Sequence, residues 1–179
     1  SAICQMSDLT PIEVHVQPNH PDITCHARPP RSHEQYEYLK KKIADLQRMG
    51  IIKPCKNPIY GSQVFAVPKK GPKRFRMVVN MKPLNKITIK SKLILPNIEQ
   101  QLHAFGDAWI FGGFDCFSGY DFLRTHPDSW MYFVLILIFG AFYMLGAPQG
   151  WISTPVLFQN RIKTAVFIPA KLFNVRHNG

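Results

Sequence analysis

Apolar residues recur at helical spacing in one early part of the chain. Residues separated by three or four positions lie on one face of a helix, and residues 36–46 follow this pattern. Ser32 is a favourable N-cap, and Gln35 three residues later completes a capping-box pattern. Gly50 marks the expected end. The sequence therefore predicts a helix whose apolar face consists of Tyr36, Leu39, Ile43 and Leu46.

Shorter segments rich in β-branched and aromatic residues predict strands. Residues 64–68 and 76–80 are expected to form two strands joined by a basic turn at residues 69–74. Residues 109–116 predict a further strand, which ends close to an aspartate. Two further helices are expected, one at 97–104 and one that begins at Ser153 or Thr154 and runs to about 164, with Pro155 at a tolerated early position.

The longest apolar run, Met131–Leu145, needs a separate interpretation. It is shorter than the roughly 20 residues that a membrane-spanning helix requires. Gly140 interrupts it, so a buried hairpin with strands at 131–139 and 141–146 fits better. Residues 1–30 are polar and contain no apolar core of a signal peptide. We therefore expect no membrane association.

These elements predict an α+β fold, with an antiparallel sheet packed on helices. No internal repeat is visible. The chain is expected to divide into three parts: an extended, proline-containing arm at residues 1–31, a basic and turn-rich region at 32–95, and a more apolar region at 96–179.

The charge balance points to a polyanionic partner. Lys and Arg total 22 against 11 Asp and Glu, which gives a net charge of +11. Such a balance favours salt-sensitive binding to nucleic acid, although a merely soluble basic protein or a ribosomal protein has the same composition. The 4 cysteines contain no C-x-x-C pair, which argues against a zinc site and favours reduced thiols inside a cell.

Candidate catalytic chemistry centres on Asp115, at the expected end of a strand. An aspartate in this position is more often a turn or cap residue than a metal ligand. Taken alone, the residues therefore indicate a basic α+β protein that binds nucleic acid.

Four ordered motifs extend this interpretation. The segment FDCFSGY at 114–120 resembles the L-D-x-x-S-G-Y motif of gypsy-class retroelement reverse transcriptases, and PQGW at 148–151 with the following Pro155 and Phe158-Gln159 resembles their P-Q-G-W-x-x-x-P-x-x-F-Q motif. Residues 50–54 and 67–86 resemble the start of the fingers and its basic hairpin. The resemblance implies the fingers and an incomplete palm of a right-hand polymerase.

The resemblance also implies roles for individual residues. Asp115 would be the catalytic residue that ligates Mg²⁺ (or Mn²⁺), and Tyr120 would exclude a ribose 2′-hydroxyl. The other implied nucleotide-binding residues are Lys69, Arg76, Phe117, Ser118, Gly119, Gln149 and Gly150. Without the resemblance, Lys69 and Arg76 would be interpreted as solvated turn charges, Tyr120 as an ordinary core tyrosine and Gly150 as a loop glycine.

The chain also departs from the family pattern. The family's V-D-Y-R is replaced by Val79-Asn80-Met81-Lys82, and the family's Y-x-D-D acids have no counterpart, because no Asp or Glu follows Asp128. A two-metal site needs several carboxylates. We therefore do not expect this chain to bind the metal or to be active on its own.

Two functions remain open at this stage. The chain is a fragment of a reverse transcriptase, an RNA-directed DNA polymerase that copies an RNA or DNA template, or it is a non-catalytic remnant that binds nucleic acid or protein. The expected partners are a primer–template, deoxynucleotide triphosphates and the remainder of a Pol polyprotein. The expected location is intracellular, in the cytoplasm, a retroelement particle or the nucleus.

Overall fold

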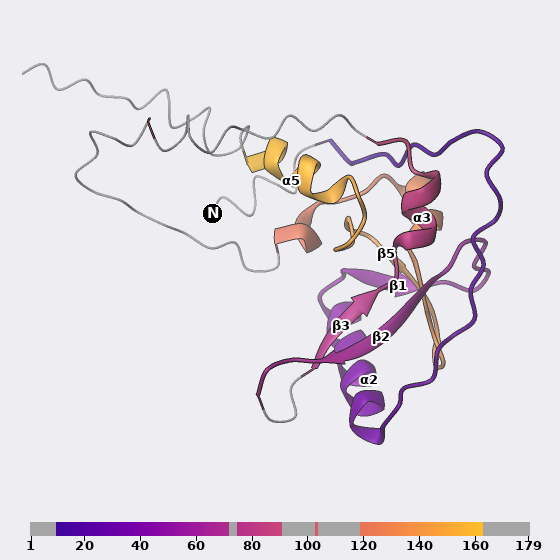
Figure 1. Cartoon of the computed structure of the whole chain (residues 1–179), viewed down its shortest axis with the longest axis vertical. Coiled ribbons are helices and arrows are strands. Elements are labelled where there is room, and N and C mark those ends of the chain that lie inside the picture. Colours follow the sequence, from indigo (N-terminus) through magenta and orange to yellow (C-terminus); the bar gives the residue numbers. More distant parts are fainter. Residues whose placement is uncertain (1–9, 72–74, 91–102, 104–118, 163–179) are drawn as a thin grey trace, which may run out of the picture.

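The computed structural model describes residues 10–71, 75–90, 103 and 119–162 (Figure 1). Helices α3 and α5 lie at the upper end of the molecule in this view, α2 lies at the lower end, and strands lie between them. The elements are α2 (His33–Arg48), β1 (Ile52–Pro54), β2 (Ser62–Pro68), β3 (Phe75–Val79), α3 (Lys82–Ile87), the 3₁₀ helices η1 (Gly119–Phe122) and η2 (Pro127–Tyr132), β4 (Val134–Leu137), β5 (Gly140–Met144) and α5 (Thr154–Ile162).

The five described strands form one sheet in the order β1-β5-β4-β2-β3. Three pairings are antiparallel, and the fourth, between β2 and β4, is parallel, with Ser62 opposite Leu135 and Gln63 opposite Ile136. The α+β class is confirmed, but the expectation of a purely antiparallel sheet was wrong. The sheet is mixed because β4 follows a long intervening segment and so can enter the sheet alongside β2 in the same direction.

Helix α2 forms as its sequence predicts. Ser32 caps it, since its hydroxyl accepts a 3.3 Å hydrogen bond from the Gln35 amide. The Gln35 side chain completes the cap by accepting from the amide of Arg31, at 2.9 Å, instead of from Ser32 itself. Leu39, Ile43 and Leu46 are buried, and each gains about 2 kcal/mol from burial.

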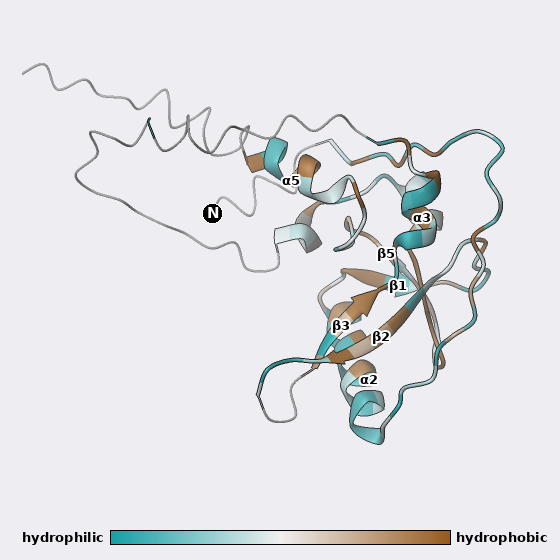
Figure 2. Cartoon of the chain, in the orientation of Figure 1, coloured by the Kyte–Doolittle hydropathy of each residue, from teal (hydrophilic) through white to brown (hydrophobic). Residues whose placement is uncertain are grey.

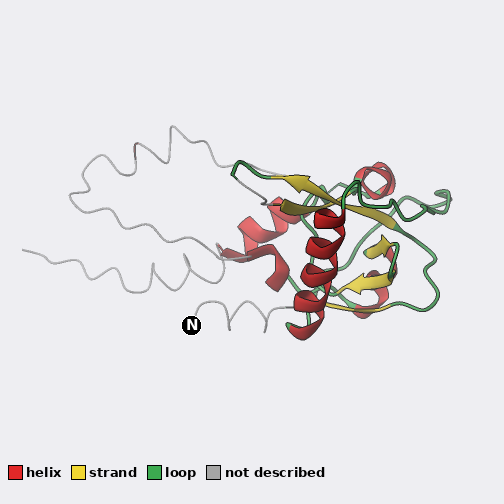
Figure 3. Cartoon of the chain, turned by 90° about the horizontal axis from the view of Figure 1, so that it is seen from below, coloured by secondary structure: helices red, strands yellow, loops and turns green. Residues whose placement is uncertain are grey.

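The buried face of α2 packs against strands β1, β2 and β3. In Figure 3 this helix crosses in front of the sheet when the molecule is seen from below. Figure 2 shows hydrophobic residues along the strands and hydrophilic ones along the outward side of α2. The half-buried Tyr36 extends the apolar face, because its ring meets Phe139 edge-on at 6.0 Å.

The apolar run at 131–145 forms the predicted hairpin with different limits. Its first strand begins only at Val134, because Pro127–Tyr132 is a 3₁₀ helix that starts at a proline and is capped by His126. The turn lies at residues 138–139, and Gly140 is the first residue of β5, opposite Leu137. Among the described residues, no helix is long and apolar enough to cross a membrane.

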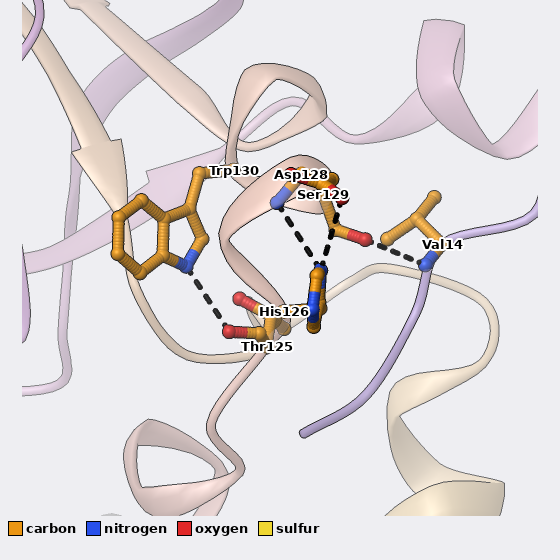
Figure 4. Close-up of polar contacts among 6 residues, drawn as sticks. All are labelled: Val14, Thr125, His126, Asp128, Ser129 and Trp130. Atoms are coloured by element: carbon orange, nitrogen blue, oxygen red, sulfur yellow. Dashed lines mark hydrogen bonds and ion pairs between the residues drawn. The ribbon is translucent and has the colours of Figure 1, made fainter.

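Residues 10–17 of the N-terminal arm are held along the molecule by backbone hydrogen bonds. Ile12 exchanges bonds with Arg124 and His126, at 2.9 and 2.8 Å, and the Val14 amide donates to the hydroxyl of Ser129 at 2.9 Å (Figure 4). Beyond these, the Gln17 amide donates to the carbonyl of Ile87, at 2.8 Å. The arm therefore connects η2 to the end of α3.

The remaining predicted elements have mixed outcomes. The hairpin predicted at 64–68 and 76–80 and the C-terminal helix are confirmed as β2, β3 and α5 within a few residues. The helix predicted at 97–104, apart from position 103, and the strand predicted at 109–116 lie outside the described residues. The three-part division of the chain stays a prediction.

Candidate functional site

Helix α3 lies next to the best-defined candidate site and was not predicted as a helix. It has six residues, too few to display an apolar period, although Pro83 sits in its first turn, where proline is tolerated. Met81 is its N-cap and makes no side-chain cap bond. Instead the side-chain oxygen of Asn80 accepts from the Lys82 amide, at 3.3 Å.

The segment 147–153 forms a tight loop that leads into α5. Pro148 is fully buried, and its carbonyl accepts hydrogen bonds from the Trp151 amide at 3.3 Å and the Thr154 hydroxyl at 2.8 Å. Gly150 has φ of +92°, a conformation that glycine adopts without steric cost. Gln149 and Gly150 are exposed at the tip of the loop. The loop therefore leaves these two residues open to solvent, and their nucleotide-binding role stays a prediction.

Side chains at the end of α3 hold this loop. The side-chain nitrogen of Asn85 donates to the Gly150 carbonyl at 2.8 Å, and its side-chain oxygen accepts from the backbone amide of Ile152 at 2.9 Å. The buried indole of Trp151 donates to the hydroxyl of Thr88 at 3.1 Å. Two segments that are more than 60 residues apart in the sequence are thus joined by three hydrogen bonds.

A cleft of about 710 Å³ opens beside this junction. Three of its lining residues are lysines and none is acidic, so the local potential is positive and attracts anions. Its apolar lining includes Ile89 and Ile152, both exposed. The lining residues are Gln17, Lys82, Asn85, Lys86, Thr88, Ile89, Lys90 and Ile152.

Sequence reasoning assigned no role to the residues that build this cleft. Asn85 and Lys86 belong to the Leu84-Asn85-Lys86 segment that resembles the family pattern, and this was the available signal. Gln17 and Thr88 carried no signal, because their positions depend on the backbone bonds between the arm and the end of α3.

Tyr120 lies on η1 and is half-buried. Its ring meets that of Phe158 on α5 edge-on, at 4.9 Å and 85°. Tyr120 therefore packs against the hydrophobic core, as an ordinary core tyrosine does. The neighbouring Gly119 is also half-buried, and the nucleotide-binding roles of both residues stay predictions.

Lys69 and Arg76 lie at the turn end of the β2–β3 hairpin, and both are exposed. Gly150 lies at the other end of β3, where a Cβ atom built on it would be 3.8 Å from Met81 Cγ and 3.9 Å from the Val79 carbonyl. The structure therefore places these two cations and the loop at opposite ends of one strand.

The predicted catalytic residue Asp115 lies outside the described residues, as do Phe117 and Ser118. Within the described part of the chain, no group of three His, Cys, Asp or Glu side chains could hold a metal ion. The metal-binding role of Asp115 stays a prediction.

Comparison with known proteins gives a consistent picture. No family model matches the chain. It is 32% identical over 128 residues to the retrovirus-related Pol polyprotein from transposon opus of Drosophila melanogaster. This alignment covers 69% of this chain and 13% of that protein. It is 31% identical over 138 residues to the enzymatic polyprotein of figwort mosaic virus (strain DxS), covering 75% of this chain and 21% of that protein.

A third similar protein comes from a retrovirus. The chain is 30% identical over 150 residues to the Gag-Pol polyprotein of bovine immunodeficiency virus (strain R29), with 73% of this chain and 9% of that protein covered. The chain thus spans between about a tenth and a fifth of the length of these three relatives.

Proposed function

From the premise that the homologues of this chain are Pol polyproteins of retroelements, we propose that it forms the fingers and incomplete palm of a gypsy-class reverse transcriptase. In this role it binds a primer–template and deoxynucleotide triphosphates as one part of a longer polyprotein. The reaction is template-directed DNA synthesis. The remaining carboxylates of the metal site then come from outside this chain, since no Asp or Glu follows Asp128.

One observation carries the proposal. The Asn85 side chain, from the segment that resembles the end of the family's basic hairpin, binds the loop that carries the PQGW segment. Two of the four motifs therefore meet at the edge of a cleft lined by Lys82, Lys86 and Lys90. Phosphate groups of a nucleic-acid strand are suitable ligands for such a lysine-lined surface.

The described residues account for binding and orientation. The lysines attract and position the phosphate backbone. The exposed Gln149 and Gly150 lie in the loop that Asn85 binds, and in this proposal their amide and backbone groups contact the nucleotide. Mg²⁺ or Mn²⁺ would activate the primer 3′-hydroxyl and stabilise the developing charge on the triphosphate. Asp115 is the residue of this chain proposed to bind it.

A paired charge-removal experiment tests the binding surface. The variant Lys82→Gln/Lys86→Gln removes two cations from the cleft, and Lys40→Gln/Lys41→Gln removes two exposed cations from α2 at the far end of the molecule. Affinity for an RNA–DNA primer–template is measured across a salt series. We expect the cleft variant to reduce the slope of log K against log salt by about 2, and the α2 variant to leave it nearly unchanged. Equal effects of the two variants would contradict the proposal.

The catalytic part needs the longer polyprotein. Asp115→Ala there is expected to abolish primer extension while leaving primer–template affinity close to that of the unaltered protein. Extension that survives this substitution would remove Asp115 from the proposed mechanism.

A further inference from the structure

We propose that Asn85, which lines the cationic cleft together with Ile152, is a positioning residue that sets the conformation of the 150–152 backbone and so fixes the exposed loop that carries Gln149 and Gly150. This inference rests on the proposed function for its consequence, nucleic-acid binding. Its structural part rests on two hydrogen bonds of 2.8 and 2.9 Å that one side chain makes to the loop.

The chemistry of the site requires a side chain at this position that donates one hydrogen bond and accepts another. The Gly150 carbonyl needs a donor and the Ile152 amide needs an acceptor, and the carboxamide of asparagine presents both in one plane. A carboxylate would keep the acceptor but direct a second oxygen at the Gly150 carbonyl. An aliphatic side chain would satisfy neither group. Asparagine is therefore the short side chain that fits both partners.

The loop also has anchors that do not involve Asn85. Thr154 binds the carbonyl of Pro148, and Trp151 binds Thr88. When Asn85 is replaced, these bonds still hold Pro148 and Thr154 at the two ends of the loop and the side chain of Trp151 within it. The substitution should therefore release Gly150 and Ile152 locally without unfolding the chain.

The structure offers a matched control in Asn80. Its side-chain oxygen accepts from the Lys82 amide, and no bond of its side-chain nitrogen is present among the described contacts. N80D keeps that acceptor, whereas N85D loses a donor. Both substitutions add one negative charge next to α3, so they change the electrostatic attraction for a polyanion alike.

The test compares the 179-residue chain with its N85D and N80D variants by two measurements. Amide hydrogen exchange of Gly150–Ile152 reports the loop, and the affinity for an RNA–DNA primer–template reports its function. Circular dichroism verifies that each variant is folded. We expect N85D to raise the exchange rate of Ile152 about tenfold and to weaken binding about tenfold relative to N80D.

An acidic titration supplies a signature that a general loss of stability would not give. A protonated carboxyl can donate through its O–H and accept through its carbonyl oxygen, as the amide donates and accepts, so protection of Ile152 in N85D should return below about pH 4. The Gly150 carbonyl favours the protonated carboxyl and moves this recovery to higher pH, whereas Lys82, Lys86 and Lys90, which line the same cleft, move it to lower pH. N85L, which cannot be protonated, should show no recovery.

The outcomes separate the two proposals. Equal exchange and equal affinity in N85D and N80D would overturn the role of Asn85 while leaving the proposed function intact. If the unaltered chain fails to bind the primer–template at low salt, the proposed function falls. In that case, faster exchange of the Ile152 amide in N85D, with protection that returns in acid, would still support the proposal that Asn85 fixes the loop conformation.

Discussion

The indole of Trp151 and the hydroxyl of Thr88 form a buried 3.1 Å hydrogen bond. The same hydroxyl donates onward to the Leu84 carbonyl of α3 at 2.8 Å. Thr88 is 3% exposed and Trp151 2% exposed, so water cannot replace either partner. The PQGW segment is therefore fixed to α3 by a short chain of buried polar groups.

Thr88→Val should destabilise the protein by about 1–3 kcal/mol, because it leaves the buried indole N–H without an acceptor while keeping the shape of the side chain. Urea denaturation followed by circular dichroism measures the loss. Thr88→Ser keeps the hydroxyl and should cost less. Unchanged stability in the valine variant would show that the hydrogen bond contributes nothing.

The N-cap of α2 provides a second prediction. Ser32→Ala removes the acceptor for the Gln35 amide and should lower the free energy of unfolding by about 1 kcal/mol. Ser32→Asp keeps an acceptor and places a negative charge at the helix N-terminus, so it should be neutral or stabilising. Thermal melts of the three proteins compare them directly, and a less stable aspartate variant would contradict the assignment of the cap.

A side chain at Gly61 would require Ile136 to shift. A Cβ atom there would lie 2.6 Å from Ile136 Cγ1 on β4, while the Gly61 amide is held by the Ile23 carbonyl at 2.8 Å. Gly61→Ala should therefore destabilise the protein by about 1–3 kcal/mol. The double variant with Ile136→Ala removes the clash, so its cost should be smaller than the sum of the single costs. Additive costs in urea denaturation would exclude the clash.

Tyr60 should make stability sensitive to alkaline pH. Burial, followed by the nearby Tyr132 and Asp22, raises the pKa of Tyr60 above its ordinary value of 10.0. The folded state therefore favours the neutral phenol, and the unfolded chain releases the proton first as the pH rises. The resulting stability is complete below pH 10 and is lost as the pH rises towards the folded-state pKa.

Tyr60→Phe removes this dependence. Between about pH 9 and pH 11 the variant should lose less unfolding free energy than the unaltered protein, in which Tyr60 still titrates. Urea midpoints at the two pH values give the comparison. Other groups that titrate in this range affect both proteins alike, and parallel losses would rule out a contribution from Tyr60.

Local signals in the sequence predicted the local parts of the fold. The cap at Ser32 and the period of Leu39, Ile43 and Leu46 specify α2 without reference to the rest of the chain. The β2–β3 hairpin similarly depends on two neighbouring segments. The parallel pairing of Ser62 with Leu135 joins distant segments, and no local pattern encodes it.

The candidate site divides in the same way. Gln149 and Gly150 were predicted from their motif; they are exposed in the loop that Asn85 binds, and their nucleotide-binding role stays a prediction. Asn85 was not assigned a role, because its partners come into reach only when α3 and the loop are folded together. The first strand of the apolar hairpin is shorter than its composition predicts, because the 3₁₀ helix η2, which begins at Pro127, extends to Tyr132.

The strand order has a consequence for how the chain is made. β1 at Ile52–Pro54 pairs with β5 at Gly140–Met144 and lies at the edge of the described sheet. During synthesis the β2–β3 hairpin can close early, but β1 has no partner until more than 80 further residues have been added. Such late, long-range pairing slows folding and leaves strand edges open meanwhile. Half-synthesised chains of this protein should therefore be the species most exposed to aggregation.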